Sequence, residues 1–418
     1  MARCRISKEK LDTIIDLGNI YLSDFLKKEN SKAPKGKLRV GFGKKSKLVQ
    51  LLDTIDQNRL YKHYWYRSGT NQTTTNQLKK IVDIVPYWVN LKNNDVVLDI
   101  GCNDGTLLKH YKNYGNFQRI GIDPATNVAR EGKKNCELHS ISFFNKKTFR
   151  RLSKKKATVI TSIGMLYDLD KPSKFVSDIY HCLDDHGIWI SQVSYAPLMI
   201  NLNAFDNILH EHMEYYTLES LIPLLNKYKL EIVDAEINDV MAGSLRLIIK
   251  KKVNKLLFTA DFTKAIGKLK LKSLILFEKK KQFGKKIIYL NFKKRVDKQK
   301  TNLLNLLKKL KKQKKLVLGY GASTKANTLL QYYGVNKSLL GAIAERQKQK
   351  VGLLTVGSWI PIISEKEMRK RKPDYLLVLP WQFIHEFIKR EVKFLKRGGK
   401  FIVPLPEVKI IGKENNER

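Results

Sequence analysis

Short apolar runs and amphipathic stretches alternate along residues 96–190. The apolar runs are "VVLDIG", "FQRIGID", "ATVITSI" and "GIWISQVSY", and the segments between them (about 106–113, 125–133 and 171–184) have apolar residues at helical spacing. Regular alternation of strand and helix predicts an α/β fold with a parallel, doubly wound sheet. Two further runs, "LEIVDAEIND" and "GSLRLIIKK", predict an antiparallel pair that closes this sheet. Before it, residues 74–90 predict a helix that leads into a strand.

The same alternation returns near the C-terminus in "KLVLGYGAST", "LLGAIAE", "YLLVLPW" and "KFIVPLP". Between the two α/β units the chain is rich in lysine, with leucines at helical spacing as in "TNLLNLLKKLKKQKK". This segment predicts a helical connector with one apolar stripe and a solvated basic face; a basic helix lying on a membrane surface is the alternative. We therefore divide the chain into a small N-terminal lobe (1–70), a first α/β domain (71–250), the connector (251–312) and a second α/β domain (313–418).

Charge is the most unusual feature of the composition. The chain carries 80 Lys and Arg against 39 Asp and Glu, a formal net charge of +41. Such an excess invites a nucleic-acid partner. The lysines are spread over the whole length, however, and no run combines arginines with stacking aromatics. We therefore expect no specific nucleic-acid partner and keep RNA binding as an alternative function.

Cysteine usage and hydropathy limit the remaining classes. The four cysteines (Cys4, Cys102, Cys136 and Cys182) form no CxxC pair, so no disulfide framework is indicated. No apolar run is long enough to span a bilayer, and the first residues lack the apolar stretch of a secretory signal. We expect a cytoplasmic protein without a membrane span; the sequence leaves open whether it is a monomer or a dimer.

A glycine-containing turn follows the first predicted strand in "VVLDIGCNDGTLL". Glycines in such a turn let the backbone approach a ligand closely. A dinucleotide site would have GxGxxG, whereas this turn has GxNxG preceded by Asp99, which would repel a diphosphate but suits the cationic end of S-adenosylmethionine. Asp123, at the end of the next strand, is placed to accept the ribose hydroxyls. The predicted S-adenosylmethionine contacts are Asp99, Gly101, Asn103, Gly105, Asp123 and, in "SIGMLYDLDKP", Met165.

A second glycine turn opens the C-terminal unit. Gly319, Gly321 and Lys325 could hold a substrate phosphate through backbone N–H groups and one ammonium group. A purely structural turn explains the glycines equally well. The positive charge of Lys325 favours a phosphate-binding turn over a purely structural one.

Two of the eight histidines flank a glutamate in "ILHEHMEYY" (208–216). A polar helix start and a general base with orienting partners both fit this stretch taken alone. His210 and His212 share a side only if the segment is extended. We expect His210 to be structural, capping the helix "TLESLIPLLNKY".

Taken together, these stretches resemble the sugar C-methyltransferases that act on nucleotide-linked 4-keto-deoxy sugars. The resemblance covers nearly the whole chain: "IDLGNIYLSDF", "LVQLLDT", "YWYRSGTNQT", "VLDIGCNDGTLL", "MLYDLDKP", "QVSYAPLMI", "NAFDNILHEHMEYY", "GYGASTKANTLLQYYG" and "KPDYLLVLPWQF" occur in order. It implies a class I (Rossmann-like) methyltransferase domain followed by a second Rossmann-like domain that holds the nucleotide-sugar substrate. It also implies methylation of C3 through an enolate, as a step of deoxysugar or surface polysaccharide biosynthesis.

The resemblance also implies roles for single residues. His212 is the implied base and Glu211 its partner, Tyr64 and Tyr66 approach the sugar and cofactor, and Tyr195 contacts the substrate. The chain departs from the family at two places. The N-terminal lobe usually binds zinc through two CxxC pairs, but only Cys4 remains, with Ser7, Gly43 and Ser46 at the other positions, so we expect no metal and a lobe held by apolar contacts alone. Leu209 stands where some members have a tyrosine.

Three other functions remain open. An O- or N-methyltransferase acting on a small molecule would need no enolate and would tolerate loss of His212. An RNA-binding or RNA-modifying protein would explain the charge. A degenerate scaffold would explain the lost cysteines, but the intact turn at 99–105 and the intact HEH stretch argue against it.

Overall fold

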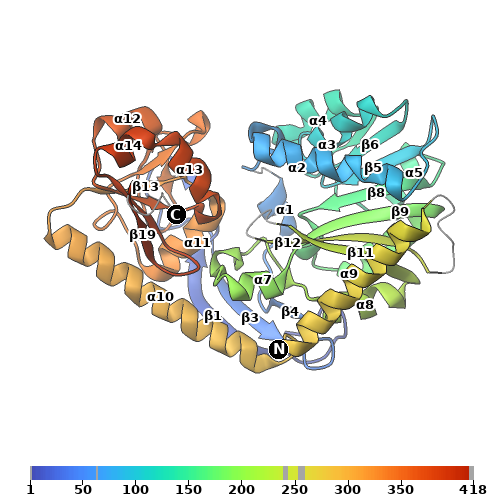
Figure 1. The fold of residues 1–418 in the computed structure, drawn as a ribbon, viewed down its shortest axis with the longest axis horizontal. Coiled ribbons are helices and arrows are strands. Elements are labelled where there is room, and N and C mark those ends of the chain that lie inside the picture. The colour runs from blue at the N-terminus through green and yellow to red at the C-terminus, as the bar shows by residue number, and fades with distance from the viewer. Residues whose placement is uncertain (1, 63–64, 239–242, 253–258, 414–418) are drawn as a thin grey trace.

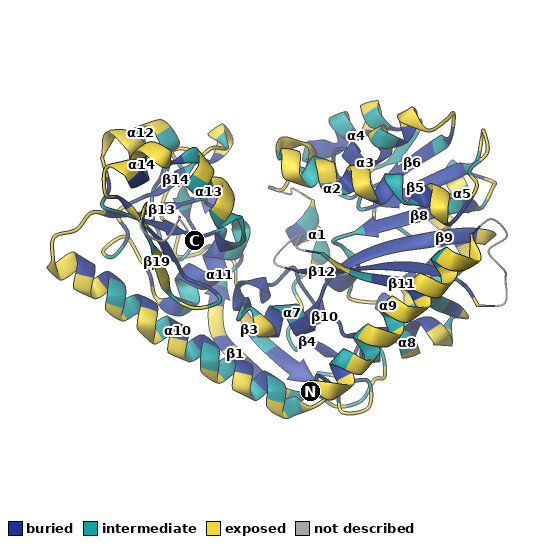
Figure 2. Ribbon diagram, viewed as in Figure 1, coloured by how far each residue is buried: buried dark blue, intermediate teal, exposed yellow. Residues whose placement is uncertain are grey.

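A computed structural model describes residues 2–62, 65–238, 243–252 and 259–413 of the chain. Figure 1 shows two α/β units facing each other, with a small β-sheet lobe below and between them and two long helices along the lower edge. The buried residues gather in the sheets and on the inner faces of the helices, as Figure 2 shows.

The N-terminal lobe is a four-stranded antiparallel sheet in the order β1-β3-β4-β10. Three of its strands come from the first residues and one from the HEH stretch far along the chain. The strands are β1 (Asp12–Tyr21), β3 (Lys35–Phe42), β4 (Val49–Leu51) and β10 (Glu214–Tyr215). A separate two-stranded pair joins β2 (Phe25–Leu26) to β15 (Leu354–Thr355) of the second α/β unit.

The first α/β unit has a seven-stranded sheet in the order β11-β12-β9-β8-β5-β6-β7. The expected α/β fold is confirmed, and so is the closing pair, because β12 runs antiparallel to both β9 and β11. All five residues of the central strand β5 are buried, as a strand covered on both faces requires. The strands are β5 (Val96–Ile100), β6 (Gln118–Ile122), β7 (Leu138–Ser140), β8 (Ala157–Ile163), β9 (Leu183–Ser194), β11 (Leu230–Asn238) and β12 (Ser244–Lys251).

Helices cover both faces of this sheet (Figure 1). The helices along this part of the chain are α1 (Gln57–Tyr61), α2 (Gln72–Asp83), α3 (Thr106–His110), α4 (Ala129–Asn135), α5 (Lys146–Leu152), α6 (Pro172–Cys182), α7 (Ala196–Asn201) and α8 (Leu218–Lys227). The prediction of a strand after the helix near residue 74 is wrong, because α2 is followed by a single 3₁₀ turn, Val85–Tyr87. Pro86 in this turn has no N–H to give to a sheet ladder, and the apolar residues around it pack between helix and sheet.

Two helices connect the α/β units. They are α9 (Asp261–Lys280) and α10 (Lys286–Lys312). Along α10 the residues Val296, Leu303, Leu307 and Leu310 are buried at spacings of three, four and seven, so one face packs inward and the lysines face water. No helix in the part of the chain described here is long and apolar enough to cross a membrane.

The second α/β unit has a six-stranded sheet in the order β16-β14-β13-β17-β18-β19, parallel except for β19. Its strands are β13 (Val317–Tyr320), β14 (Ile343–Glu345), β16 (Ile362–Ser364), β17 (Tyr375–Val378), β18 (Lys400–Val403) and β19 (Lys409–Ile411). Its helices are α11 (Thr324–Tyr333), α12 (Glu365–Lys370), α13 (Ile384–Arg390) and α14 (Val392–Lys396).

Candidate active site

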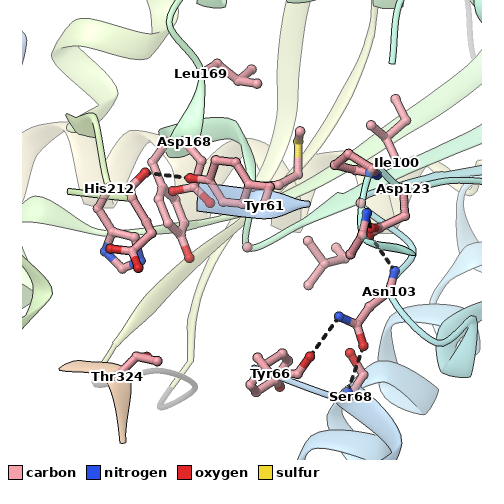
Figure 3. Close-up of a pocket in the computed structure, with 18 of the residues that line it drawn as sticks. Tyr61, Tyr66, Ser68, Ile100, Asn103, Asp123, Asp168, Leu169, His212 and Thr324 are labelled. Carbon is pink, nitrogen blue, oxygen red and sulfur yellow. Dashed lines mark hydrogen bonds between the residues drawn. The ribbon is translucent and has the colours of Figure 1, made fainter. Parts of the chain in front are cut away.

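A cavity of about 780 Å³ lies between the two α/β units. Its walls are the turns that follow β5, β6 and β8, the segment from residue 57 to 77, the HEH stretch, and the segments 323–325 and 380–386 of the second unit. Open α/β sheets bind ligands at the carboxyl ends of their strands, and β5 is the strand at which the chain order reverses. Figure 3 shows Asp123 and Asn103 on one side of the cavity and His212, Asp168 and Tyr61 on the other.

The turn after β5 forms the cofactor side. Gly101 has φ +71°, lines the cavity, and lies over Met165, whose side chain a Cβ at this position would touch at 3.4 Å. Asp123 at the end of β6 also lines the cavity; its carboxylate accepts the N–H groups of Asn103 and Ala125, both at 2.8 Å. A carboxylate fixed by two N–H groups still has lone pairs to offer to a ligand.

Asp99 lies behind this turn and lines a second cavity, of about 50 Å³, which shares Gly101 and Tyr66 with the large one. The pKa of Asp99 is raised to about 7, mainly by burial and also by the negative charges of Asp123 and Asp104. The hydrogen bond from Thr161 opposes this shift. A cation beside this carboxyl would offset the cost of its charge. These residues therefore fit the positively charged amino-acid end of S-adenosylmethionine.

Asn103 and Asp104 hold the segment before α2 in place. Asn103 accepts the N–H of Ser68 (3.1 Å) and donates to the carbonyl of Tyr66 (3.0 Å), while Asp104 accepts the N–H of Gly69 (2.7 Å). The Asn103 side chain is therefore engaged in positioning the cavity wall. The expected cofactor contact at Gly105 does not reach the cavity: this glycine has φ +73° and packs against α4, where a Cβ would lie 2.8 Å from that of Asn135.

The HEH stretch is fixed at both of its ends. Its last residues form β10 of the lobe, and Tyr216 bridges to Tyr195 at the end of β9. His210 donates through Nε2 to the carbonyl of Gly36 in the lobe (3.2 Å). The expectation that His210 caps the following helix is wrong, because Thr217 caps α8 and Ser220 completes a capping box there.

His212 lines the cavity and is held in one tautomer. Its Nδ1 lies 2.9 Å from the carbonyl oxygen of Asn207. Because a carbonyl only accepts, Nδ1 carries the proton and Nε2 keeps a lone pair. Burial and, to a smaller extent, the nearby ammonium of Lys325 lower the pKa of His212 to about 3, although the Asn207 contact opposes this shift. The ring therefore stays neutral at pH 7 and has a lone pair to accept a proton, but its low pKa makes it a weaker base than an exposed histidine.

Two buried carboxyl groups lie beside His212 in the cavity wall. Burial raises the pKa of Glu211 to about 7, and burial together with Glu211 and Glu214 raises that of Asp168 well above its usual range. Within the described residues, Glu211 Oε2 and Asp168 Oδ1 have no hydrogen-bond partner. Tyr61 donates to the backbone carbonyl of Glu211 at 2.8 Å. Both residues line the cavity, but these two oxygens are themselves buried in its wall.

Lys325 brings the second α/β unit to this spot. It lies in the first turn of α11, lines the cavity, and donates to Oδ1 of Asn207, the residue that orients His212. Burial lowers the pKa of Lys325, while Asp206 and Asp168 oppose that shift. Gly319 and Gly321, which were expected beside it, do not line the cavity. Gly319 is in β13 and packs on Ile343, and Gly321, with φ +86°, packs on Pro380.

The remaining expected contacts fall in different places. Tyr66 lines the cavity, with its hydroxyl 3.4 Å from that of Thr74. Tyr64 is outside the described residues. Tyr195 is fully buried away from the cavity and donates to Glu278 of α9 at 2.6 Å. Leu209 lines the cavity, and its side chain can donate no hydrogen bond.

Sequence reasoning did not find Asp168, Tyr61 or Asn207. Asp168 could have been found, because it lies in the short 3₁₀ turn that follows β8 and the segments after strand ends carry ligands in this fold. Asn207 carried no signal, since its contribution to His212 is a backbone carbonyl.

The N-terminal lobe is not held by apolar contacts alone. The Cys4 thiol donates to Ser46 Oγ at 3.2 Å, and the Glu9 carboxylate accepts from the hydroxyl of Ser7 (2.7 Å) and from the N–H groups of Lys45 and Ser46 (both 2.9 Å). Burial alone would raise the pKa of Glu9, but these hydrogen bonds lower it to about 2. Glu9 therefore joins the loop of Ser7 to the loop of Lys45 and Ser46. Among the described residues, no group of three or more His, Cys, Asp or Glu could hold a metal ion.

Comparison with known proteins gives two family matches. The family described as "C-methyltransferase C-terminal domain" matches residues 239–406, and that described as "Methyltransferase domain" matches residues 72–235. The C-methyltransferase NovU of Streptomyces niveus is 27% identical over 370 residues, which are 88% of this chain and 86% of NovU.

Two solved structures are similar to part of the chain. The magnesium protoporphyrin IX methyltransferase of Synechocystis PCC 6803 with bound S-adenosylmethionine is 14% identical, with 43% of this chain and 78% of that chain covered and a TM-score of 0.31. An S-adenosylmethionine-dependent methyltransferase of Clostridium acetobutylicum is 11% identical, with 43% and 92% covered and a TM-score of 0.32.

Proposed function

Because this chain is an S-adenosylmethionine-dependent methyltransferase, we propose that it transfers the methyl group to carbon, at C3 of a nucleotide-linked 4-keto-deoxy sugar. The family match over residues 239–406 and the similarity to NovU support transfer to carbon. The resemblance in ordered stretches along the chain supports the sugar. The product would serve deoxysugar or surface polysaccharide synthesis.

The neutral imidazole of His212 carries the proposal. Carbon becomes a nucleophile only after it loses a proton, and a ketone at C4 acidifies the proton on C3. Nε2 of His212 would take that proton, and the electron pair of the C–H bond would pass to the C4 oxygen as an enolate. The Asn207 carbonyl holds the ring so that Nε2 keeps its lone pair. S-adenosylmethionine supplies the electrophilic methyl group that the C3 carbon then receives.

The developing oxyanion needs donors. The ammonium of Lys325 is held beside His212 through Asn207 and can donate to a developing oxyanion there. The Tyr66 hydroxyl lies on the opposite, cofactor side of the cavity. In this proposal Lys325 therefore donates to the C4 oxygen, whereas the sequence suggested that it binds the substrate phosphate.

Proton exchange separates carbon methylation from transfer to oxygen or nitrogen. Each member of a panel of nucleotide-linked 4-keto-6-deoxy sugars is incubated in D₂O with the protein and S-adenosylhomocysteine, and deuterium at C3 is followed by NMR. We expect exchange with at least one sugar and, with S-adenosylmethionine, a new carbon–methyl bond. His212→Asn should lose exchange and transfer by about 10²- to 10⁴-fold.

Tyr215→Phe is the control variant, because Tyr215 is buried in the adjoining strand β10 without lining the cavity. It should keep both reactions within a few fold. Methyl transfer to oxygen or nitrogen that survives His212→Asn would contradict the proposal.

A further inference from the structure

Four large apolar side chains are exposed along one face of α9. Phe262, Ile266, Leu269 and Leu276 are 77%, 36%, 64% and 56% exposed. Their spacings of four, three and seven residues put them on one side of the helix, and Ser273 falls in the same row. We call these four residues the α9 outer stripe.

The opposite face of α9 makes the packing contacts. Gly267 and Glu278 are buried there: Gly267 lies against the backbone of β11, and Glu278 accepts hydrogen bonds from Tyr195, Leu218 and Glu219. The outer stripe is thus not the core face of the helix. Single exposed apolar residues are common on soluble proteins, but a surface helix normally has polar residues along its outer face. Figure 2 shows α9 at the lower right edge of the molecule, with exposed residues along its length.

A row of lysines accompanies the outer stripe. Lys268, Lys272 and Lys279 are exposed and lie about 90° around the helix from it. On the other flank Lys270 lies near Asp234 and Glu236, at 3.5 and 3.9 Å. The acids of α9 are Asp261 at its first residue and the buried Glu278. The outer surface of α9 is therefore apolar and cationic.

We propose that α9 binds in the plane of an anionic lipid bilayer, with the outer stripe in the boundary between headgroups and acyl chains and the lysine row on the lipid phosphates. An amphipathic helix with an apolar face and lysines beside it has this chemistry. A second copy of the chain fits less well. Two such helices would bring lysine row against lysine row, and four side chains bury far less than the roughly 1,200 Å² of a stable interface.

The test compares binding to vesicles that contain roughly half phosphatidylglycerol with binding to pure phosphatidylcholine vesicles at about 0.15 M salt, measured by co-sedimentation. The full-length protein should sediment with the anionic vesicles and remain in solution with the neutral ones. The variant F262S/L269S/L276S should bind the anionic vesicles about tenfold more weakly or worse. The control variant L316S/V351S/V392S also replaces three exposed apolar residues, all in the second α/β unit, and should bind like the unaltered protein.

Two outcomes would overturn the proposal. Equal binding by F262S/L269S/L276S and the unaltered protein would mean that lysines alone hold the protein on anionic lipid. A dimer in the absence of vesicles that this variant dissociates, seen by light scattering, would assign the outer stripe to a second copy. Unchanged S-adenosylmethionine binding by the variant shows that a loss of vesicle binding is not a loss of fold.

Discussion

At the scale of the residue, one backbone carbonyl decides how His212 can react. Asn207 lies five residues before it, and its carbonyl oxygen fixes which ring nitrogen carries the proton. The Asn207 side chain accepts from Lys325, so a single residue sets both the tautomer of the proposed base and the place of the proposed oxyanion donor. Imidazole and ammonium are thereby held together without a direct bond between them.

We predict that His212 stays neutral, as the Nδ1–H tautomer, from pH 8 down to pH 5. Burial lowers its pKa from 6.5 to about 3. An unfolded chain takes up a proton near pH 6.5 that the folded chain does not take up until about pH 3, so burial of His212 costs increasing stability as the pH falls through this interval. ¹⁵N-histidine NMR between pH 8 and pH 5 checks this. A shift of the His212 nitrogens near pH 6.5 would contradict it.

We predict that Glu9→Gln lowers the free energy of unfolding by about 1–2 kcal/mol at pH 7. The folded-state pKa of Glu9 is about 2 against an ordinary 4.5, so its contribution is complete above pH 4.5 and is lost as the pH falls towards 2. The difference between the two proteins in urea unfolding should shrink over that interval. Glu407→Gln, which removes an exposed partner of Lys409, should change little at any pH.

At the scale of the element, the connector is tied to the first α/β unit by one carboxylate. Glu278 of α9 accepts the hydroxyl of Tyr195 (2.6 Å) and the N–H groups of Leu218 (2.7 Å) and Glu219 (3.0 Å) at the start of α8. Helix starts have N–H groups without partners in the helix, and a carboxylate there is stabilising. Tyr195 therefore has a structural role at the place where α8, α9 and the HEH stretch meet.

We predict that Glu278→Ala costs about 2–4 kcal/mol of stability, because it leaves several buried hydrogen-bond donors without a partner. Tyr195→Phe should cost about 1 kcal/mol, because it leaves only one buried acceptor without a partner. The double variant should cost less than the sum, as measured by urea unfolding. Tyr195→Phe should keep kcat/KM within about threefold. A large rise in KM with unchanged stability would instead support the substrate contact expected from the sequence.

At the scale of the whole molecule, the cavity proposed as the active site has walls from both α/β units. Lys325 reaches Asn207, Trp381 donates to Asp206 at 3.1 Å, and Thr73 donates to Glu386 at 2.9 Å, each contact joining the second unit to the first. The HEH stretch lies at this junction and also belongs to the lobe sheet.

We predict that Lys325→Met lowers kcat by about 10²- to 10³-fold with a small change in KM, because an oxyanion donor acts mainly in the transition state. A contact to the substrate phosphate would raise KM and leave kcat nearly unchanged, which separates the two roles of this lysine in steady-state kinetics. Lys350→Met is the matched control. Lys350 is a buried lysine of the same unit that donates to the carbonyl of Ala322 (2.8 Å), so this variant should lose stability while kcat stays within a few fold.

Local sequence patterns predicted much of the fold of this protein. Apolar runs between glycine turns predicted both sheets because a strand covered on two faces needs continuous apolar residues. Gly101 and Asp123 both line the cavity because strand ends meet at one edge of a parallel sheet. The strand expected after α2 failed because apolar residues next to a proline look alike in a strand and in a turn packed on a sheet.

The sequence by itself thus determined the α/β fold, the cofactor turn and the residue types available for chemistry, since these depend on neighbours in the chain. The tertiary structure alone decided that Asn207 orients His212, that Lys325 joins the same site from more than a hundred residues away, and that Tyr195 and Gly105 do not reach it. Those outcomes depend on contacts between distant segments and on backbone groups that every residue carries. No local pattern encodes which carbonyl will meet which side chain.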